Sequence, residues 1–260
     1  RYVQMATEGG VPQAMYPEGG LTVDGRLREP RFGLLDYMLK GFNPDGDRDL
    51  VFIPVGINYD RVLEDRTQLL KLDPTPARPG LAHTLSVTLR YLARQAWFGL
   101  TGRRYRNGYA CVNFGLPVSM RALVRREGVD FRTLDDASRR DAVARVGALL
   151  MAAIAEIVPV LPVPLVAQVL LREPERAWSS FDLSAAVHDL VREVEARGAR
   201  VYVPRSDFDY ALAVGLRMLT MRRLIRLDAG HYRVEPAETR LLAYYANSIA
   251  HLCAPDPARA

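Results

Sequence analysis

Short apolar runs alternate with amphipathic segments in the N-terminal part of this chain, the pattern of strands joined by crossover helices. Residues 50–57 form the most strand-like run, Leu-Val-Phe-Ile-Pro-Val-Gly-Ile. Because this run is apolar without a break, it predicts a strand buried on both faces, as in a parallel sheet. Residues 109–114 predict a further strand, and residues 33–40 and 81–98 predict helices.

The pattern changes after residue 118 and becomes mostly helical. Helical periodicity covers residues 135–157, 164–171, 184–197, 207–222 and 236–252. A short hairpin around Asp228-Ala229-Gly230 separates the last two helices. We therefore expect an α/β fold with two parts. Residues 1–118 form an α/β domain with a mixed or parallel sheet, and residues 119–260 form a helical region packed on it.

The longest apolar stretch, residues 147–171, is long enough to raise the question of a membrane-spanning helix. Glu156, Pro159, Pro162 and Pro164 interrupt it, and prolines break a helix. The stretch therefore predicts two buried helices joined by a proline-rich corner, so that any membrane contact is peripheral.

The composition is that of an ordinary soluble globular chain: 260 residues, 49% apolar and 25% charged. It excludes disordered, collagen-like and repeat-array proteins. The first residue is Arg1 and no apolar signal segment follows, so we expect the chain to be part of a longer polypeptide. Cys111 and Cys253 lack the paired spacing of a zinc site or a disulfide framework, which favours a reducing cytoplasmic compartment.

The net charge of +5 leaves an anionic partner open, either a phosphate compound or an acidic lipid surface. Only Lys40 and Lys71 are lysines among the 35 basic residues, and the arginines are spread along the chain. The dense basic run that marks a nucleic-acid-binding tail does not occur.

The common catalytic motifs, such as a nucleophile elbow, a Walker loop or a dinucleotide fingerprint, do not occur in the sequence. The most informative segment is Tyr-Pro-Glu-Gly-Gly at residues 16–20, which Arg26, Arg28 and Arg31 follow closely. A carboxylate accepts hydrogen bonds from hydroxyl groups, and guanidinium groups bind phosphate through two parallel bonds. This region therefore predicts a site for a phosphorylated polyol, and a solvated surface turn is the alternative interpretation.

Four segments in their order along the chain resemble the bacterial PlsB-type glycerol-3-phosphate acyltransferase family and its dihydroxyacetone-phosphate relatives. They are Tyr-Pro-Glu-Gly-Gly at 16–20, Ile-Pro-Val-Gly-Ile-Asn-Tyr at 53–59, Val-Asn-Phe-Gly at 112–115 and Tyr-Tyr-Ala-Asn-Ser-Ile-Ala-His-Leu at 244–252. The resemblance implies transfer of a fatty acyl group from acyl-CoA or acyl-carrier protein to the sn-1 hydroxyl of glycerol 3-phosphate, which gives lysophosphatidate. It also implies no cofactor, no metal and no nucleic acid. The enzyme would lie peripherally at the cytoplasmic face of the bacterial inner membrane, on an anionic membrane surface.

The resemblance also assigns substrate-binding residues. Glu18, Gly19, Gly20 and Thr22 fall in the block that binds the acceptor, and Pro54 falls in the block linked to the acyl donor. Family members often carry Arg at the position of Leu21, so we expect a nearby arginine, Arg26, to replace it in phosphate binding.

The family's catalytic His-x4-Asp block precedes the acceptor block, so it would lie upstream of Arg1, and we expect no catalytic residue within this chain. The missing residues should leave the sheet without its first strand or strands and expose apolar surface. His251 and Asp256 have the same spacing, but they lie in the wrong order along the chain beside Pro255. We therefore interpret His251 as structural, and also Tyr244, Tyr245 and Asn247 on the last helix.

Two alternatives remain open. One is a dihydroxyacetone-phosphate acyltransferase. The other is a winged-helix-like nucleic-acid-binding module, because residues 184–235 run helix, helix, hairpin. Its recognition helix would be residues 207–222, which are largely apolar and begin with Asp207 and Asp209. The arginines available to contact phosphates would be Arg217, Arg222, Arg223 and Arg226.

Overall fold

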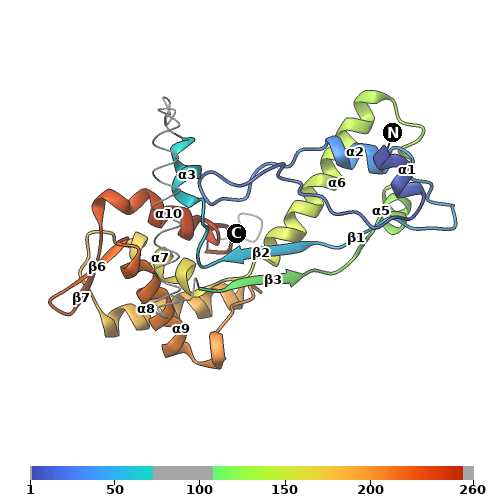
Figure 1. Cartoon of the computed structure of the whole chain (residues 1–260). Helices are drawn as coiled ribbons and strands as arrows, with labels where there is room; N and C mark the ends of the chain where they lie inside the picture. The colour runs from blue at the N-terminus through green and yellow to red at the C-terminus, as the bar shows by residue number, and fades with distance from the viewer. Residues whose placement is uncertain (1, 73–107, 254–260) are drawn as a thin grey trace, which may run out of the picture.

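The computed structural model describes residues 2–72 and 108–253, and the molecule is elongated (Figure 1). Three helices gather at one end: α1 (Tyr2–Glu8), α2 (Gly33–Leu39) and α5 (Met120–Glu127). The opposite end holds α3 (Asp65–Leu70) and most of the chain after residue 160. The long helix α6 (Asp136–Glu156) runs between the two ends.

A two-stranded antiparallel ribbon runs beside α6 and is called the β ribbon below (Figure 1). Its strands are β1 (Val51–Phe52), β2 (Val55–Tyr59), β3 (Ala110–Phe114) and β4 (Val118–Ser119). Phe52 lies opposite Val118, whereas Val55 lies opposite Phe114, so the β3–β4 side holds one residue more between the two ladders. This bulge lies at the break that Pro54 makes in the first strand, because proline has no backbone N–H for the ladder.

The strands at residues 50–57 and 109–114 are confirmed, but the predicted mixed or parallel sheet is wrong. Every strand pair within residues 2–72 and 108–253 is antiparallel, and the parallel contact there is one isolated bridge between Val160 and Val201. Burial along β2 alternates: Gly56 and Asn58 are buried, whereas Ile57 is exposed. Strand β3 runs beside β2 in the opposite direction, and an antiparallel sheet can fold with only one face covered.

The larger hydrophobic core surrounds α7 (Pro162–Arg172), which is buried along nearly its whole length. Around it pack α8 (Ser180–Ala196), α9 (Phe208–Met221), α10 (Thr239–Asn247) and α11 (Ala250–Cys253). A smaller core joins α2 and α5 to the N-terminal half of α6 through Leu35, Met120 and Val143. The long helix therefore joins two separate hydrophobic cores.

The helices predicted after residue 120 are confirmed, with bounds set by local caps. The side chains of Asp135, Ser179 and Asp207 each accept a hydrogen bond from the backbone N–H three residues later, which begins α6, α8 and α9. The predicted helix at 236–252 divides into a 3-10 turn (Pro236–Glu238), α10 and α11. The predicted helix at 81–98 lies outside the described residues.

The apolar stretch 147–171 forms two helices, as predicted: α6 ends at Glu156, and α7 begins at Pro162 after the turn. Proline at the first helical position is favourable because its missing N–H has no partner there in any case. Across residues 2–72 and 108–253, no helix has the length and apolarity needed to cross a bilayer.

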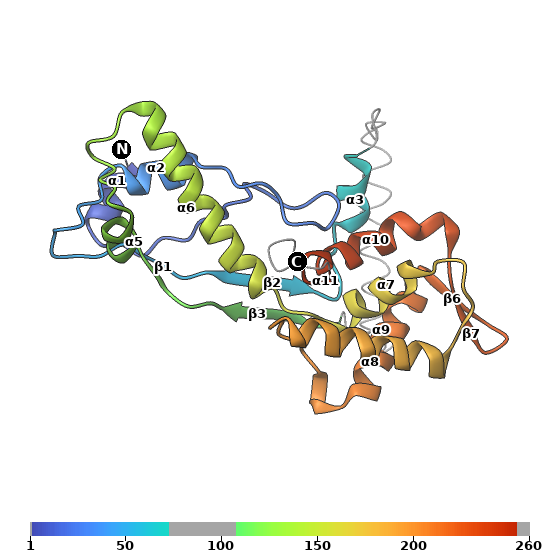
Figure 2. The same ribbon diagram turned by 180° about the vertical axis from the view of Figure 1, so that it is seen from behind.

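The elements from α7 to α11 are called the helical unit below. A three-stranded antiparallel sheet lies at the end of this unit (Figure 2). It consists of β5 (Trp178–Ser179), β6 (Ile225–Asp228) and β7 (His231–Val234), in the spatial order β5-β7-β6. The predicted hairpin is thus confirmed, and Ala229 and Gly230 have the positive φ angles that a tight hairpin turn requires. With α7, α8 and α9, the order of elements is that of a winged helix.

Candidate functional site

Residues 16–31, called the 16–31 loop below, leave the N-terminal end of the molecule and return to it. Hydrogen bonds tie its two arms together: the Arg31 N–H donates to the Pro17 carbonyl at 2.7 Å, and the Arg28 N–H donates to Glu18 Oε2 at 2.9 Å. Glu18 therefore helps to close the loop with one of its carboxylate oxygens.

The loop brings two arginine side chains next to the glycines that follow Glu18. Gly19 has a φ of +68°, a left-handed conformation that glycine adopts without strain. A Cβ there would lie 2.5 Å from Arg31 Cδ, so the Arg31 side chain lies directly across Gly19. Arg28 Nη1 donates to the Leu21 carbonyl at 3.2 Å, and a Cβ on Gly20 would touch the same guanidinium group at 3.5 Å. A carboxylate and two guanidinium groups are thus gathered around one turn.

Thr22 and Arg26 lie at the tip of the loop and have different surroundings. Thr22 Oγ1 donates to Asp24 Oδ1 at 3.1 Å and accepts from the Gly25 N–H at 3.0 Å, so it shapes the turn. Arg26 Nε is 3.9 Å from Asp24 Oδ2, and the Arg26 side chain is 63% exposed. The structure therefore places Arg28 and Arg31, and not Arg26, beside the Glu18-Gly19-Gly20 turn.

Helix α10 supports the tip of the 16–31 loop. Asn247 Nδ2 donates to the Asp24 carbonyl at 2.8 Å. Gly25 is buried with a φ of +88°, and a Cβ at this position would collide with the backbone carbonyl of Tyr244. The loop can therefore approach the helix this closely only with glycine at position 25.

The same C-terminal segment, residues 244–252, is also connected to the β ribbon. Asn58 Nδ2 donates to the Pro159 carbonyl at 2.9 Å and to Ser248 Oγ at 3.2 Å. Asn113 Nδ2, from the neighbouring strand, donates to the Ile157 carbonyl at 2.9 Å. Three of the four segments that resemble the acyltransferase family, residues 53–59, 112–115 and 244–252, thus meet around the turn between α6 and α7, and residues 16–20 are linked to α10 only through the tip of their loop.

His251 is structural, as interpreted from the sequence. Its Nε2 lies 3.1 Å from the Ala155 carbonyl, and burial lowers the pKa of the imidazole. Because a carbonyl oxygen only accepts hydrogen bonds, Nε2 carries the proton and donates. Asp256, the other half of the His-x4-Asp spacing, lies outside the described residues.

Comparison with known proteins gives the family. Residues 97–258 match the glycerol-3-phosphate acyltransferase C-terminal region. The chain belongs to this family. It is 26% identical over 271 residues to the glycerol-3-phosphate acyltransferase of Pseudomonas putida KT2440, and the alignment covers 97% of this chain but 30% of that protein.

Shorter alignments with two other relatives have higher identity. The glycerol-3-phosphate acyltransferase of Pseudomonas paraeruginosa PA7 is 31% identical over 134 residues, which is 52% of this chain and 15% of that protein. The enzyme of Pseudomonas fluorescens Pf-5 is 30% identical over 132 residues, 51% of this chain and 14% of that protein. The chain thus spans less than a third of the length of these acyltransferases.

A buried ion pair holds this acyltransferase-family chain together at α10. Arg222 Nη1 lies 2.6 Å from Asp65 Oδ2, and the Tyr245 hydroxyl donates to the same carboxylate. The Val62 N–H donates to the Tyr245 hydroxyl at 3.3 Å, and burial raises the pKa of that hydroxyl. The structural role predicted for Tyr245 is confirmed, but its partners come from distant parts of the chain and the sequence carried no signal for them.

Asp60 is a second buried acid that sequence reasoning missed. It is 1% exposed and directly follows β2; its Oδ1 accepts from the Val163 N–H at 2.9 Å, and its Oδ2 accepts from the Tyr109 N–H at 3.0 Å. It therefore caps the first turn of α7 and ties the end of the β ribbon to it. Burial raises the pKa of Asp60 to about 6, against the lowering effect of the two N–H groups. An acid directly after a predicted strand was the available signal.

Pro54, the residue assigned to the acyl-donor block, is buried in the β ribbon. Its carbonyl accepts from the Gly115 N–H at 2.9 Å, and a Cβ on Gly115 would lie 3.2 Å from Pro54 Cβ. Pro54 thus sets the bulge between the two ladders, and its assignment to donor binding stays a prediction.

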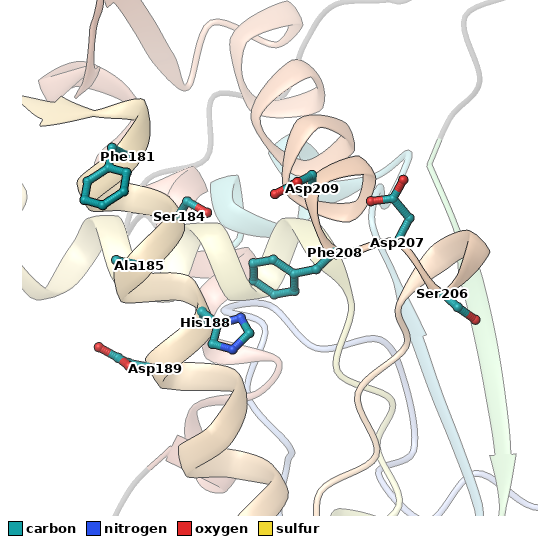
Figure 3. Close-up of a pocket in the computed structure, with 9 residues that line it drawn as sticks. All are labelled: Phe181, Ser184, Ala185, His188, Asp189, Ser206, Asp207, Phe208 and Asp209. Atoms are coloured by element: carbon teal, nitrogen blue, oxygen red, sulfur yellow. The ribbon is translucent and has the colours of Figure 1, made fainter.

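A surface hollow between α8 and α9 is separate from the 16–31 loop (Figure 3). His188 lies edge-on to Phe208 there, with ring centroids 4.9 Å apart, so the histidine packs against an aromatic ring. The hollow is lined by Phe181, Ser184, Ala185, His188, Asp189, Ser206, Asp207, Phe208 and Asp209. None of the predicted substrate-binding residues contributes to it. Over the described ranges, no group of three or more His, Cys, Asp or Glu side chains is placed to hold a metal ion.

Proposed function

We propose that this chain supplies the acceptor-binding part of a glycerol-3-phosphate acyltransferase. The full enzyme transfers a fatty acyl group from acyl-CoA or acyl-carrier protein to the sn-1 hydroxyl of glycerol 3-phosphate, and lysophosphatidate is the product. The observation that carries this proposal is the turn at Glu18-Gly19-Gly20, where one carboxylate and the guanidinium groups of Arg28 and Arg31 are gathered. Membership of the acyltransferase family supports it.

Each group at the turn suits one part of the acceptor. The Glu18 carboxylate accepts hydrogen bonds from glycerol hydroxyls, and the glycines let the two arginine side chains lie close to the backbone beside it. Arg28 and Arg31 bind the phosphate. They take the place of the arginine that family members often carry at the position of Leu21. In this proposal Thr22 shapes the turn, Arg26 is peripheral to the phosphate, and Pro54 belongs to the donor side.

The acyl transfer needs a base to take the proton from the attacking hydroxyl. In the proposed reaction the sn-1 oxygen attacks the thioester carbonyl directly, the thiol of the donor leaves, and no cofactor, metal or covalent acyl-enzyme takes part. The His-x4-Asp block that the resemblance implies would supply the base from outside these residues. The reaction would take place peripherally at the cytoplasmic face of the bacterial inner membrane, on an anionic lipid surface.

Acyl transfer from labelled acyl-CoA to glycerol 3-phosphate tests the proposal. We expect activity in a polypeptide extended upstream to include the His-x4-Asp block, loss of that activity when the histidine is replaced, and none in the 260-residue chain. Dihydroxyacetone phosphate is supplied as a competing acceptor. Preferential acylation of this acceptor would indicate a dihydroxyacetone-phosphate acyltransferase instead. A folded extended protein that uses neither acceptor would contradict the proposal.

Arginine variants of the extended protein locate the phosphate. Arg31→Gln and Arg28→Gln should each raise the KM for glycerol 3-phosphate by about tenfold and leave the KM for acyl-CoA unchanged, because one charge-assisted contact is lost. Arg26→Gln is the matched control, since Arg26 pairs with Asp24 at the exposed tip. A larger rise in the KM for glycerol 3-phosphate in Arg26→Gln than in the other two variants would instead identify Arg26 as the phosphate ligand.

The winged-helix order of α7 to β7 is the observation that favours a nucleic-acid-binding function. The side chains of these elements argue against that function. Arg222 is engaged by Asp65 in a buried ion pair, and α9 is mostly buried in the core. Asp207 and Asp209 stand at the N-terminal end of α9, the end of a recognition helix that contacts bases. Two carboxylates there repel a phosphate backbone, so we propose no nucleic-acid partner.

A further inference from the structure

One face of the β ribbon is apolar and exposed. Phe114 is 64% exposed and Leu116 is 87% exposed, and the neighbouring side chains on the face are also large and apolar. We call this surface the outer face; it comprises Val51, Ile53, Val55, Ile57, Tyr59, Val112, Phe114 and Leu116. Contiguous exposed apolar surface of this kind marks an interaction site.

The opposite face of the β ribbon is covered by the protein itself. A Cβ on Gly56 would lie 2.7 Å from the Ile157 carbonyl oxygen, and Asn58 and Asn113 donate to carbonyls of the same turn. Both faces of β2 therefore carry residues suited to burial, although only one of them is buried in the part of the chain that the structure describes. This explains why residues 50–57 read as a strand covered on both sides.

The edges of the β ribbon are open as well. Its ladders contain two strands in the part of the chain that the structure describes, so each strand has hydrogen-bonding groups directed away from its partner. Two-stranded sheets have little stability unless a further strand or layer packs on them. Residues 51–59 and 110–119 contain no charged residue, so the charged side chains that usually protect an exposed edge do not occur.

We propose that the outer face is the interface with the remaining part of the acyltransferase polypeptide, which covers it with a second layer and extends the ribbon at its edges. The Pseudomonas putida enzyme aligns with 97% of this chain, but this alignment covers only 30% of that enzyme, so family proteins contain a large amount of additional chain. The inference rests on family membership and is independent of the proposed acyl transfer.

Other occupants fit the outer face less well. Surfaces that bind lipid combine apolar residues with lysine or arginine at the rim, and the strands of the β ribbon carry neither. A second copy of the chain would cover the face with an identical one, but it would leave unexplained why family members contain so much additional chain. Both occupants are outcomes of the experiment below.

The test uses a cysteine placed on the outer face. Ile57→Cys is introduced into this chain and into a chimera in which this chain replaces the matched region of the Pseudomonas putida enzyme. Labelling with a maleimide is followed by mass spectrometry, which reads each site separately from the natural Cys111 and Cys253. Phe181→Cys is the matched control, because Phe181 is 81% exposed and lies on α8, away from the β ribbon.

We expect the thiol introduced by Ile57→Cys to react in the 260-residue chain and to react at least about tenfold more slowly in the chimera, because burial blocks it. The thiol introduced by Phe181→Cys should react equally in both. A second variant, Ile57→Asp, should leave the unfolding of the chain alone unchanged and should destabilise the chimera, because it places a charge in a buried layer.

Three results would overturn the inference. The first is equal labelling of the Ile57→Cys variant in the chain and in a chimera that is monomeric and folded. The second is protection in the chain alone that increases with its concentration, which would assign the face to a second copy. The third is protection that requires anionic vesicles, which would assign it to a lipid surface.

Discussion

The 16–31 loop and the helical unit from α7 to α11 are stabilised in different ways. The helical unit buries a continuous apolar core around α7. The loop buries little, and hydrogen bonds from Arg28 and Arg31 together with the contacts of Gly25 and Asn247 hold it in place. A loop with few apolar contacts opens more easily than a packed core. The candidate binding residues are therefore carried by the less stable region, and the packed helical unit positions them.

A few polar side chains connect the helical unit to the elements around it, and one of them connects it to the loop. Asp65, Arg222 and Tyr245 bind α3 to the helical unit, Asp60 joins the β ribbon to α7, and Asn247 joins α10 to the loop. Substitutions at these connections and within the loop compare how much each region contributes to stability. The expected effects on stability decrease from the buried ion pair to the loop itself.

The largest effect is expected for Arg222→Met. This change leaves the Asp65 carboxylate buried without its positive partner, and such losses cost about 3–5 kcal/mol of unfolding free energy. Urea denaturation measures it. Arg217→Met is the control on α9, the helix that ends just before Arg222; Arg217 is exposed, so its loss should change stability by less than about 0.5 kcal/mol. Equal effects of the two changes would show that the ion pair does not support the fold.

A pH-dependent effect is expected from Asp60. Its pKa is about 6 in the folded protein, against about 4 in an unfolded chain. Between these values the folded state binds the extra proton, so stability should fall as pH rises from about 4 to about 6, by about 3 kcal/mol in total, and then stay level. Denaturation at a series of pH values measures this.

The control for the pH series is Asp189, which is exposed on α8. Asp60→Asn should remove the decrease in stability over this pH range, whereas Asp189→Asn should retain it. A decrease that persists in Asp60→Asn would assign the effect to another group.

A smaller effect is expected at the contact between the loop and α10. Gly25→Ala places a methyl group against the Tyr244 carbonyl, with a strained backbone, and should lower stability by about 1–3 kcal/mol. Gly230→Ala is the control, because Gly230 also has a positive φ but a Cβ there meets no atom within 4 Å. In the extended enzyme, Gly25→Ala should also raise the KM for glycerol 3-phosphate. An unchanged KM would separate the loop tip from acceptor binding.

The smallest effect on stability is expected for Glu18→Gln. The amide oxygen still accepts from the Arg28 N–H, so unfolding should change by less than about 1 kcal/mol. In the extended enzyme the KM for glycerol 3-phosphate should rise, because the charge that binds the hydroxyls is lost. Glu29→Gln, an exposed change in the same loop, is the control. Unchanged kinetics with both substrates would remove Glu18 from the site.

Local pattern predicted the individual elements well. The helices after residue 120 have their caps and periodicity in the sequence, and the hairpin at 228–230 has its turn residues there. The hydrophobic pattern did not predict that the strands pair in an antiparallel way. An unbroken apolar strand looks the same in the sequence whether its second face is covered by this chain or by another part of the protein. The order of four short segments identified the family, but it did not show which arginine lies beside Glu18.

The sequence by itself determined the helices, the strands, the family and the turn at residues 16–20, because these depend on neighbouring residues and on motifs. Only the tertiary structure decided that Arg31 lies across Gly19, that Arg222 binds Asp65 and that Asn247 holds the loop tip. These contacts join residues that are separated along the chain, and their partners are selected by packing and by the need to satisfy buried polar groups. No local pattern records that selection.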